Sequence, residues 1–142
     1  MRSMTHDEIR AFLLAGTRTA KLATVRADGR PHVAPVWFTL DGDAIIFTTW
    51  HTTVKAANLR RDPRVSLCVD DESPPFAFVL VEGAARIIDD DLEALRHWAT
   101  RIAARYMGDA LAEQYGARNG VPGELLIRVT PTRIVAQAGI AD

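Results

Sequence analysis

Apolar and polar residues alternate with a period of two along most of this chain, a pattern typical of β-strands that bury one face. In the stretch 19–27, Ala20, Leu22 and Thr24 fall on one face, and Asp28-Gly29 then supplies a hairpin turn. The alternation and the turn signals between the segments predict six strands, and the first three should form a meander. These strands are expected at residues 19–27, 32–40, 45–49, 65–69, 76–88 and 125–135.

Other segments have the spacing of helices. Thr5 and Glu8 stand in the relation of a capping box before apolar residues at helical spacing. Thr52 or Thr53 is in the position of an N-cap for a short helix that Asp62-Pro63 should stop. The expected helices cover residues 5–16, 54–61 and 89–106, with a further piece near 110–115.

The order of these elements excludes a parallel doubly wound sheet, because each parallel pair of strands needs a crossover of a dozen or more residues. We therefore predict an α+β fold built on an antiparallel β-barrel with peripheral helices. Closure into a barrel would remove exposed strand edges. The chain has 142 residues and no long linker, so residues 1–142 are expected to form a single domain.

Composition narrows the range of partners and compartments. The formal net charge is −1, with acids and bases mixed along the chain, so neither nucleic acid nor a membrane surface is an expected partner. The first ten residues are polar where a signal peptide would be apolar, and a cytoplasmic location is expected. The single cysteine, Cys68, lies in an apolar strand, where we expect a buried packing residue.

The sequence lacks the usual signatures of catalysis by protein side chains. It contains no dinucleotide-binding fingerprint, no P-loop and no serine in a nucleophile elbow. The four histidines are far apart, with no cysteine or glutamate at metal-ligand spacing, so no metal site and no catalytic side chain are predicted. An enzyme of this kind would depend on a bound cofactor for its chemistry.

The segment Thr48–Leu59 has the features of an anion site. A hydroxyl-rich strand end with Thr48 and Thr49 leads through a turn to Thr53 and a helix start, where free backbone amides favour a phosphate. Lys55 lies in the first turn of that helix, where a cation is unfavourable unless an anion accompanies it. Only Lys21 and Lys55 are lysines among 17 basic residues, so this lysine could be required by its site. The alternative is a solvated lysine on a connecting helix.

A second candidate feature is the run Pro35, Val36, Trp37 and Phe38 in the second strand. Proline marks an edge or an opening of a sheet, and the two aromatic residues could flank a flat ring. Packing of Trp37 and Phe38 in the core is the simpler explanation of the same pattern.

In these residues and the motifs around them, the chain resembles the pyridoxamine 5'-phosphate oxidase-like split-barrel superfamily. Within it the chain is similar to the branch that uses deazaflavin coenzyme F420, the flavin/deazaflavin oxidoreductases of actinobacteria. The resemblance covers nearly the whole chain. The motifs that carry it are Leu22-Ala23-Thr24-Val25, Asp28-Gly29-Arg30-Pro31-His32-Val33, Pro35-Val36-Trp37-Phe38, Thr48-Thr49, Lys55-Ala56-Ala57-Asn58-Leu59, Asp62-Pro63-Arg64-Val65 and Pro131-Thr132-Arg133-Ile134-Val135.

The resemblance implies that the antiparallel barrel is a split β-barrel and that residues 1–142 form a single split-barrel domain. It also implies a homodimer with two cofactor sites at the subunit interface. Position by position, it makes Thr53 and Lys55 phosphate contacts, joined by Thr48 and Thr49, with Asn58 in the same motif. It makes the run 35–38 the lining of the ring: Pro35, Val36, Trp37 and Phe38.

Departures from the family pattern bear on which cofactor is bound. Oxidases of this fold that use flavin mononucleotide (FMN) usually have Ser-Arg-Lys where this chain has Thr53-Val54-Lys55, and a basic residue near Trp37-Phe38. The loss of two positive contacts favours F420 over FMN, which remains the alternative cofactor.

The resemblance therefore implies a reductase that transfers a hydride from reduced F420 to a conjugated, electron-poor small molecule, such as a quinone, a bilin or an unsaturated lactone. Three alternatives stay open: an FMN-dependent oxidoreductase, a non-catalytic flavin- or tetrapyrrole-binding protein, and a barrel that serves only for dimerisation. Substrate choice is expected to depend on the loops at residues 71–75 and 116–123.

Overall fold

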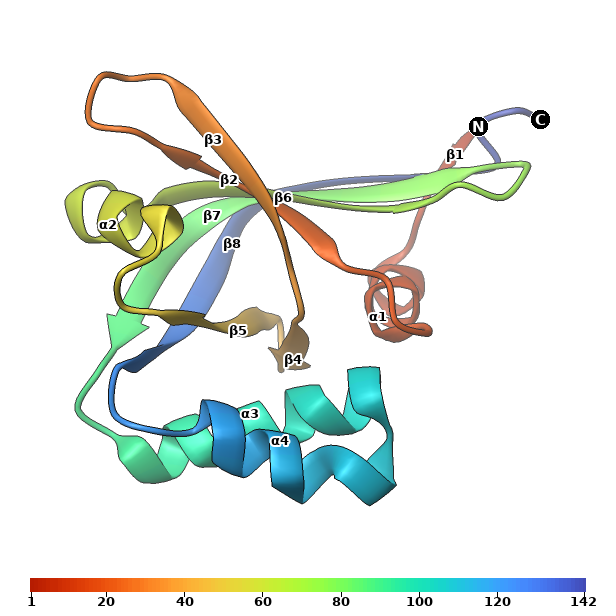
Figure 1. Ribbon diagram of the computed structural model, residues 1–142. Helices are drawn as coiled ribbons and strands as arrows, with labels where there is room; N and C mark the ends of the chain where they lie inside the picture. The colour runs from red at the N-terminus through yellow and green to blue at the C-terminus, as the bar shows by residue number, and fades with distance from the viewer.

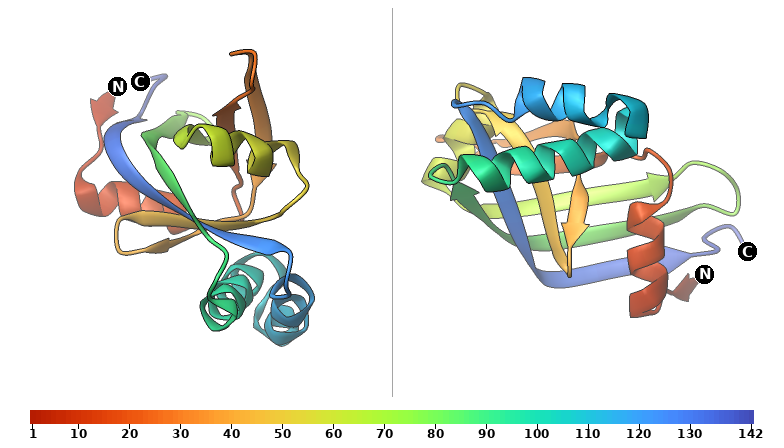
Figure 2. Two further views of the ribbon diagram at one scale, coloured as in Figure 1. Left: turned by 90° about the vertical axis from the view of Figure 1, so that its left-hand side faces the viewer. Right: turned by 90° about the horizontal axis from the view of Figure 1, so that it is seen from below.

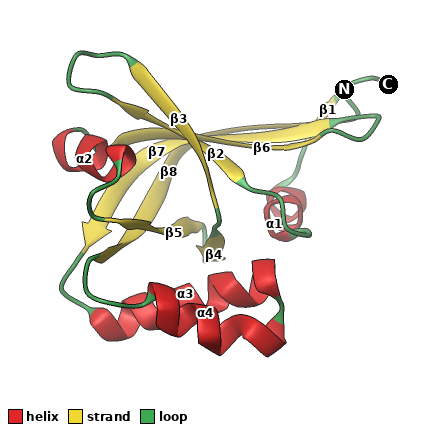
Figure 3. Ribbon diagram, viewed as in Figure 1, coloured by secondary structure: helices red, strands yellow, loops and turns green.

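The computed structural model describes residues 1–142, whose eight strands form one antiparallel sheet that curves into a split barrel with helices around it (Figures 1 and 3). The α+β split-barrel fold is confirmed. Its elements, in chain order, are β1 (Arg2–Ser3), α1 (His6–Leu14), β2 (Ala20–Val25), β3 (Pro31–Val36), β4 (Thr39–Asp41), β5 (Ala44–Trp50), α2 (Val54–Arg61), β6 (Arg64–Asp71), β7 (Ala77–Ile88), α3 (Leu92–Met107), the short 3₁₀ helix η1 (Asp109–Leu111), α4 (Ala112–Asn119) and β8 (Glu124–Ala138).

The strands follow the order β3-β2-β6-β7-β8-β5-β4, and β1 pairs with the far end of β8. The prediction of one continuous strand over residues 32–40 is wrong, because the strand is broken at Trp37 and Phe38 into β3 and β4. Residues before the break pair with β2 and residues after it pair with β5, so the predicted meander of the first three strands does not form. At the break, α3 replaces a strand as the partner of the backbone: the Phe38 amide donates to the Tyr106 hydroxyl, 3.2 Å away.

The last strand is longer than predicted and passes through Pro131 without ending. Glu82 pairs with Arg133 and Gly83 pairs with Pro131, so the register shifts by one residue at this point. A shift of this kind absorbs the missing amide of proline as a bulge. The same strand pairs with β5 at its start, where Trp50 lies opposite Glu124.

The helices largely follow the sequence signals. Thr5 and Glu8 form the predicted capping box, and α2 covers the predicted residues with Thr53 as its N-cap. The predicted loop 116–123 is wrong in its first part, because α4 continues to Asn119. Gly116 and Gly120 let α4 lie directly against α3: a Cβ at Gly116 would be 2.9 Å from the Thr100 Cα.

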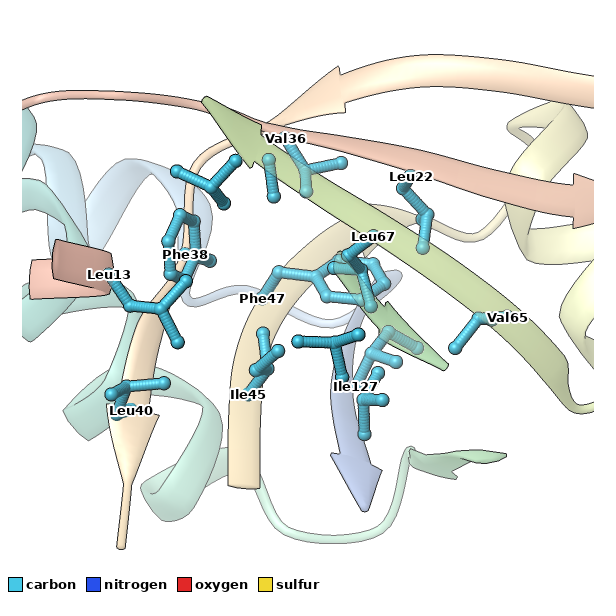
Figure 4. Close-up of a cluster of buried hydrophobic side chains, with 14 of the residues drawn as sticks. Leu13, Leu22, Val36, Phe38, Leu40, Ile45, Phe47, Val65, Leu67 and Ile127 are labelled. Atoms are coloured by element: carbon cyan, nitrogen blue, oxygen red, sulfur yellow. The ribbon is translucent and has the colours of Figure 1, made fainter. Parts of the chain in front are cut away.

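The core lies inside the curved sheet, between the strands and α1. Figure 4 shows Phe47 and Ile127 near its centre, with Phe38 and Leu13 toward one end. Phe38 and Phe47 are both fully buried. A second, smaller apolar cluster joins α3 to the outer face of β5 and β8, and Figure 2 shows α3 and α4 running side by side across that face. Its buried members are Ile46, Leu95, Ile102 and Leu126.

None of the helices combines the length and the apolar character that a transmembrane segment requires.

Candidate functional site

A pocket of about 280 Å³ lies where β3, β5, α2 and the α3–α4 pair meet. It collects residues from six elements that are far apart in the sequence, and β5 and β8 bring two of them together by pairing. Five of the nine predicted site residues line this pocket: Pro35, Val36, Trp37, Thr48 and Lys55. The other lining residues are Ala99, Ile102, Asn119 and Glu124.

Lys55 is the cation of this pocket. It lies in the first turn of α2, its side chain is half-buried, and no hydrogen bond or ion pair within the chain engages its ammonium group. The other lysine differs in this respect, because Lys21 Nζ lies 3.5 Å from a carboxylate oxygen of Asp70. A half-buried ammonium group without a protein partner favours an anion from solution.

Two of the predicted threonines build the turn that presents Lys55. Thr53 caps α2 by accepting from the Ala56 amide at 3.2 Å, and its hydroxyl donates to the Trp50 carbonyl at 3.0 Å. The Thr49 hydroxyl lies 2.8 Å from the Thr53 hydroxyl and is buried. These two hydroxyls are therefore engaged within the protein, while Thr48 faces the pocket.

Trp37 forms the aromatic wall. Its ring is stacked on that of Tyr106, with the two planes within 5° and the centroids 5.0 Å apart. The Tyr106 hydroxyl accepts from the Phe38 amide and donates to the Arg18 carbonyl at 2.8 Å, which fixes the ring that supports Trp37. Burial raises the pKa of Tyr106, so the hydroxyl remains a proton donor.

Four of the nine predicted residues do not line the pocket: Thr49 and Thr53, which build the turn before α2, and Phe38 and Asn58. Phe38 is buried in the core behind the pocket (Figure 4). Asn58 is buried between α2 and β2, where its amide donates to the Thr24 hydroxyl at 3.0 Å and its carbonyl oxygen accepts from Arg61. Both side chains support the walls of the site from behind instead of lining it.

Glu124 is the ionisable residue of the pocket that sequence reasoning missed. It begins β8 opposite Trp50, directly after Gly123, whose φ of 102° and contact with the Trp50 ring leave no room for a side chain. Burial raises the pKa of Glu124, and a hydrogen bond with Thr48 together with the charges of Lys55 and Arg118 lowers it by less. No local signal marks this glutamate, since its place depends on the pairing of β8 with β5.

Comparison with known proteins places the chain in a family. The family model of pyridoxamine 5'-phosphate oxidase matches residues 5–138. The chain belongs to this family. It is 30% identical, over 139 residues, to the F420H2-dependent biliverdin reductase of Mycobacterium tuberculosis, and the match covers 96% of this chain and 90% of that protein.

Solved structures of related proteins agree with this assignment. A conserved hypothetical protein from Mycobacterium tuberculosis superposes with a TM-score of 0.83 at 30% identity, covering 96% of this chain and 86% of that one. A structure named F420 reductase superposes with a TM-score of 0.67 at 28% identity, covering 87% of this chain and 94% of that one.

Two other hollows of this pyridoxamine 5'-phosphate oxidase family member lack the combination of a cation and an aromatic wall. One, of about 430 Å³, is a shallow area on the sheet around Ser66 and Glu82. The other, of about 360 Å³, lies between α1 and the β4–β5 turn, with His6 on its rim.

Cys68, expected to be buried in the core, is only half-buried on the outer face of β6, because the alternate residues of that strand face the core.

The raised pKa of Glu124 gives a testable effect of pH on the stability of this family member. A carboxyl whose pKa is higher in the folded protein binds more protons there, so its contribution to stability is lost as pH rises through the folded pKa. Glu124→Gln should therefore raise the melting temperature more at pH 8 than at pH 4.5, measured by thermal unfolding. The exposed Glu113→Gln serves as the control, and an equal shift at both pH values would contradict the assignment.

Proposed function

We propose that this protein is an F420-dependent reductase, which binds the reduced deazaflavin in the Lys55 pocket and transfers its hydride to a conjugated, electron-poor small molecule. The observation that carries the proposal is the half-buried, unpaired ammonium group of Lys55 beside the Trp37 wall. The cation suits a phosphate and the aromatic wall suits a flat ring. One pocket can therefore contact both the phosphate and the ring of a flavin-like cofactor.

The residues present fit such a group. Lys55, with the amides at the start of α2, would hold the phosphate, and Pro35, Val36 and Trp37 would line the ring. Val54, which stands where FMN oxidases usually have arginine, is apolar and exposed, so it adds no second positive charge. The names of the two reductase relatives further support F420 as the cofactor.

The bound deazaflavin would supply the hydride. The part of this chain is to hold and orient, because the pocket wall is built from fixed groups: Trp37 is stacked on Tyr106, and Val36 is buried in the core. Fixing a ring against an acceptor replaces a bimolecular encounter by an oriented contact, which is a main source of rate enhancement. The apolar Ala99 and Ile102 of α3 reduce access of water to the same space.

We also propose that the protein acts as a homodimer, with each pocket completed by the partner. The pocket of one chain is open, and apolar side chains near its mouth remain exposed. Trp37, Trp50 and Val54 are 38%, 42% and 45% exposed. Apolar surface of this kind is typical of an interface that covers it.

The acceptor that we propose to test first is a bilin, because biliverdin is the substrate in the name of the 30% identical relative.

The two loops that were expected to select the substrate differ in position. Residues 116–119 belong to α4, whose last residue, Asn119, lines the pocket. Residues 71–75 lie at the β6–β7 turn, at the opposite end of the sheet from α2 (Figure 1).

Binding of F420 tests the cofactor assignment. Lys55→Met removes the cation and should weaken F420 binding about 30-fold, because a charge-assisted hydrogen bond contributes about 2 kcal/mol. The measurement is a fluorescence titration of F420 with the wild-type protein, Lys55→Met and the control Lys21→Met, which removes the lysine outside the pocket. Oxidation of reduced F420 by biliverdin, a quinone and an unsaturated lactone then tests the reductase activity.

The outcomes separate the alternatives. Equal F420 affinity for Lys55→Met and wild type would overturn the phosphate assignment. Tight binding of FMN with no binding of F420 would make the protein a flavin enzyme instead. Tight F420 binding without turnover of any of the three acceptors would support a binding protein without catalytic activity.

A further inference from the structure

The pocket contains two ionisable side chains of opposite charge, Lys55 from α2 and Glu124 from β8. They do not form an ion pair, since no carboxylate oxygen lies within 4.0 Å of the Lys55 ammonium group. Thr48, which also lines the pocket, is the polar neighbour that lowers the pKa of the Glu124 carboxyl and so favours its ionised form. Both charges are therefore available to a ligand that enters between them.

Glu124 also has no ion-pair partner elsewhere. Arg118 on α4 attracts it from a distance, and the Arg118 guanidinium lies over the Tyr115 ring and bonds Asn119 instead. On the other side, Asp89 and Asp91 border the adjoining hollow, and they add negative charge near Glu124. The remaining ionisable neighbour is His51, whose Nδ1 bonds the Gly123 carbonyl at 2.9 Å. The carboxylate is thus compensated only partly by the protein.

We propose that Glu124 is a specificity-determining residue of this pocket, which makes it select a phosphodiester, with one negative charge, over a phosphomonoester, with two. The inference rests on the proposed function, in which a flavin-like phosphate binds at Lys55. When both side chains are ionised, the pair has a formal charge of zero. Each negative charge of a ligand is attracted by Lys55 and repelled by Glu124. The repulsion by Glu124 reduces the binding free energy that a second negative charge would add.

This selection acts on the two cofactors that the fold could bind. The phosphate of F420 is a diester and has one negative charge, whereas FMN is a monoester that has close to two at pH 8. A pocket that opposes the second charge would bind FMN more weakly than a diester without any steric barrier. An acidic residue that opposes the wrong ligand is a recognised means of specificity, in addition to contacts that attract the right one.

The test compares two ligands that share one ring and differ in phosphate charge: FMN and riboflavin 4',5'-cyclic phosphate, which is a diester. Their dissociation constants are measured at pH 8 by flavin fluorescence for the wild type, Glu124→Gln and the control Glu113→Gln, with F420 titrated in parallel. The glutamine keeps the shape of the side chain and one acceptor oxygen, and it removes the charge. Thermal unfolding checks that each variant is folded.

Glu124→Gln should shift the ratio of the two dissociation constants about tenfold in favour of FMN. One extra charge at roughly 8 Å, in a partly exposed site, interacts with an energy that corresponds to about this factor. Glu113→Gln should leave the ratio unchanged. An unchanged ratio in Glu124→Gln, with F420 still bound through Lys55, would overturn this inference alone. A shifted ratio without F420 binding would overturn the proposed cofactor alone, and absence of binding by all three ligands would overturn both.

Discussion

Arg105→Met should lower the free energy of unfolding by about 4 kcal/mol, because it leaves the carbonyl groups of two buried residues, Leu13 and Phe38, without their charged donor. The half-buried Arg105 guanidinium has no carboxylate partner. It donates instead to the backbone carbonyls of Leu13 at 2.6 Å, Phe38 at 2.8 Å and Gly16 at 3.0 Å. It also lies over the Phe38 ring, 4.5 Å from its centroid. One side chain of α3 thereby joins the end of α1 to the strand break.

Chemical denaturation of the wild type, Arg105→Met and Arg101→Met measures this effect. Arg101 is the matched control, because it lies one turn earlier on α3, is exposed and contacts only the Trp98 ring. Its loss should change stability by less than about 0.5 kcal/mol. Similar values for the two variants would show that the three carbonyls find other donors.

Gly116→Val should cost about 3 kcal/mol, although valine is a better helix former than glycine. The direction reverses because α4 and α3 are in contact at this residue. A Cβ at Gly116 would lie 2.0 Å from the Thr100 hydroxyl oxygen and 2.9 Å from its Cα. The hydroxyl is itself bonded to the Arg96 carbonyl at 2.8 Å, so it is not free to rotate away. The helices must therefore move apart.

Thermal unfolding of Gly116→Val is compared with Gln114→Val, an exposed residue of the same helix, which should change little. Because Asn119 at the end of α4 lines the pocket, Gly116→Val should also weaken F420 binding. A stable Gly116→Val variant would contradict the close packing of the two helices.

Sequence patterns predicted the elements whose signals are local. The capping box of α1, the cap and length of α2, and the periodicity of β6 and β7 depend on neighbouring residues, and all are confirmed. Features that depend on distant residues were missed. The break at Trp37 and Phe38 exists because side chains of α3, some 68 residues later, satisfy the backbone there. Pairing of Arg2–Ser3 with β8 joins the two ends of the chain.

The same distinction applies to the site. Lys55 stood out because its helix start and its rarity are visible in the sequence, and the structure places it in the pocket. Glu124 could not be found in this way, because it reaches the pocket only through the pairing of β8 with β5. Asn119 lies in the segment 116–123 that was expected to affect substrate choice, but its place in the pocket depends on the packing of α4 on α3. The side chains of Phe38 and Asn58 lie in or near motifs of the family, yet the fold uses them for packing.

The Tyr106 hydroxyl, which links α3 to the strand break, has a consequence for engineering this protein. It makes α3 part of the scaffold, since any change that moves this helix also disturbs the backbone at Phe38 and the ring of Trp37. By contrast, α4 borders the pocket through Asn119 and makes no hydrogen bond to the strand break. Libraries designed to accept bulkier acceptors should therefore vary the end of α4 and keep α3 constant.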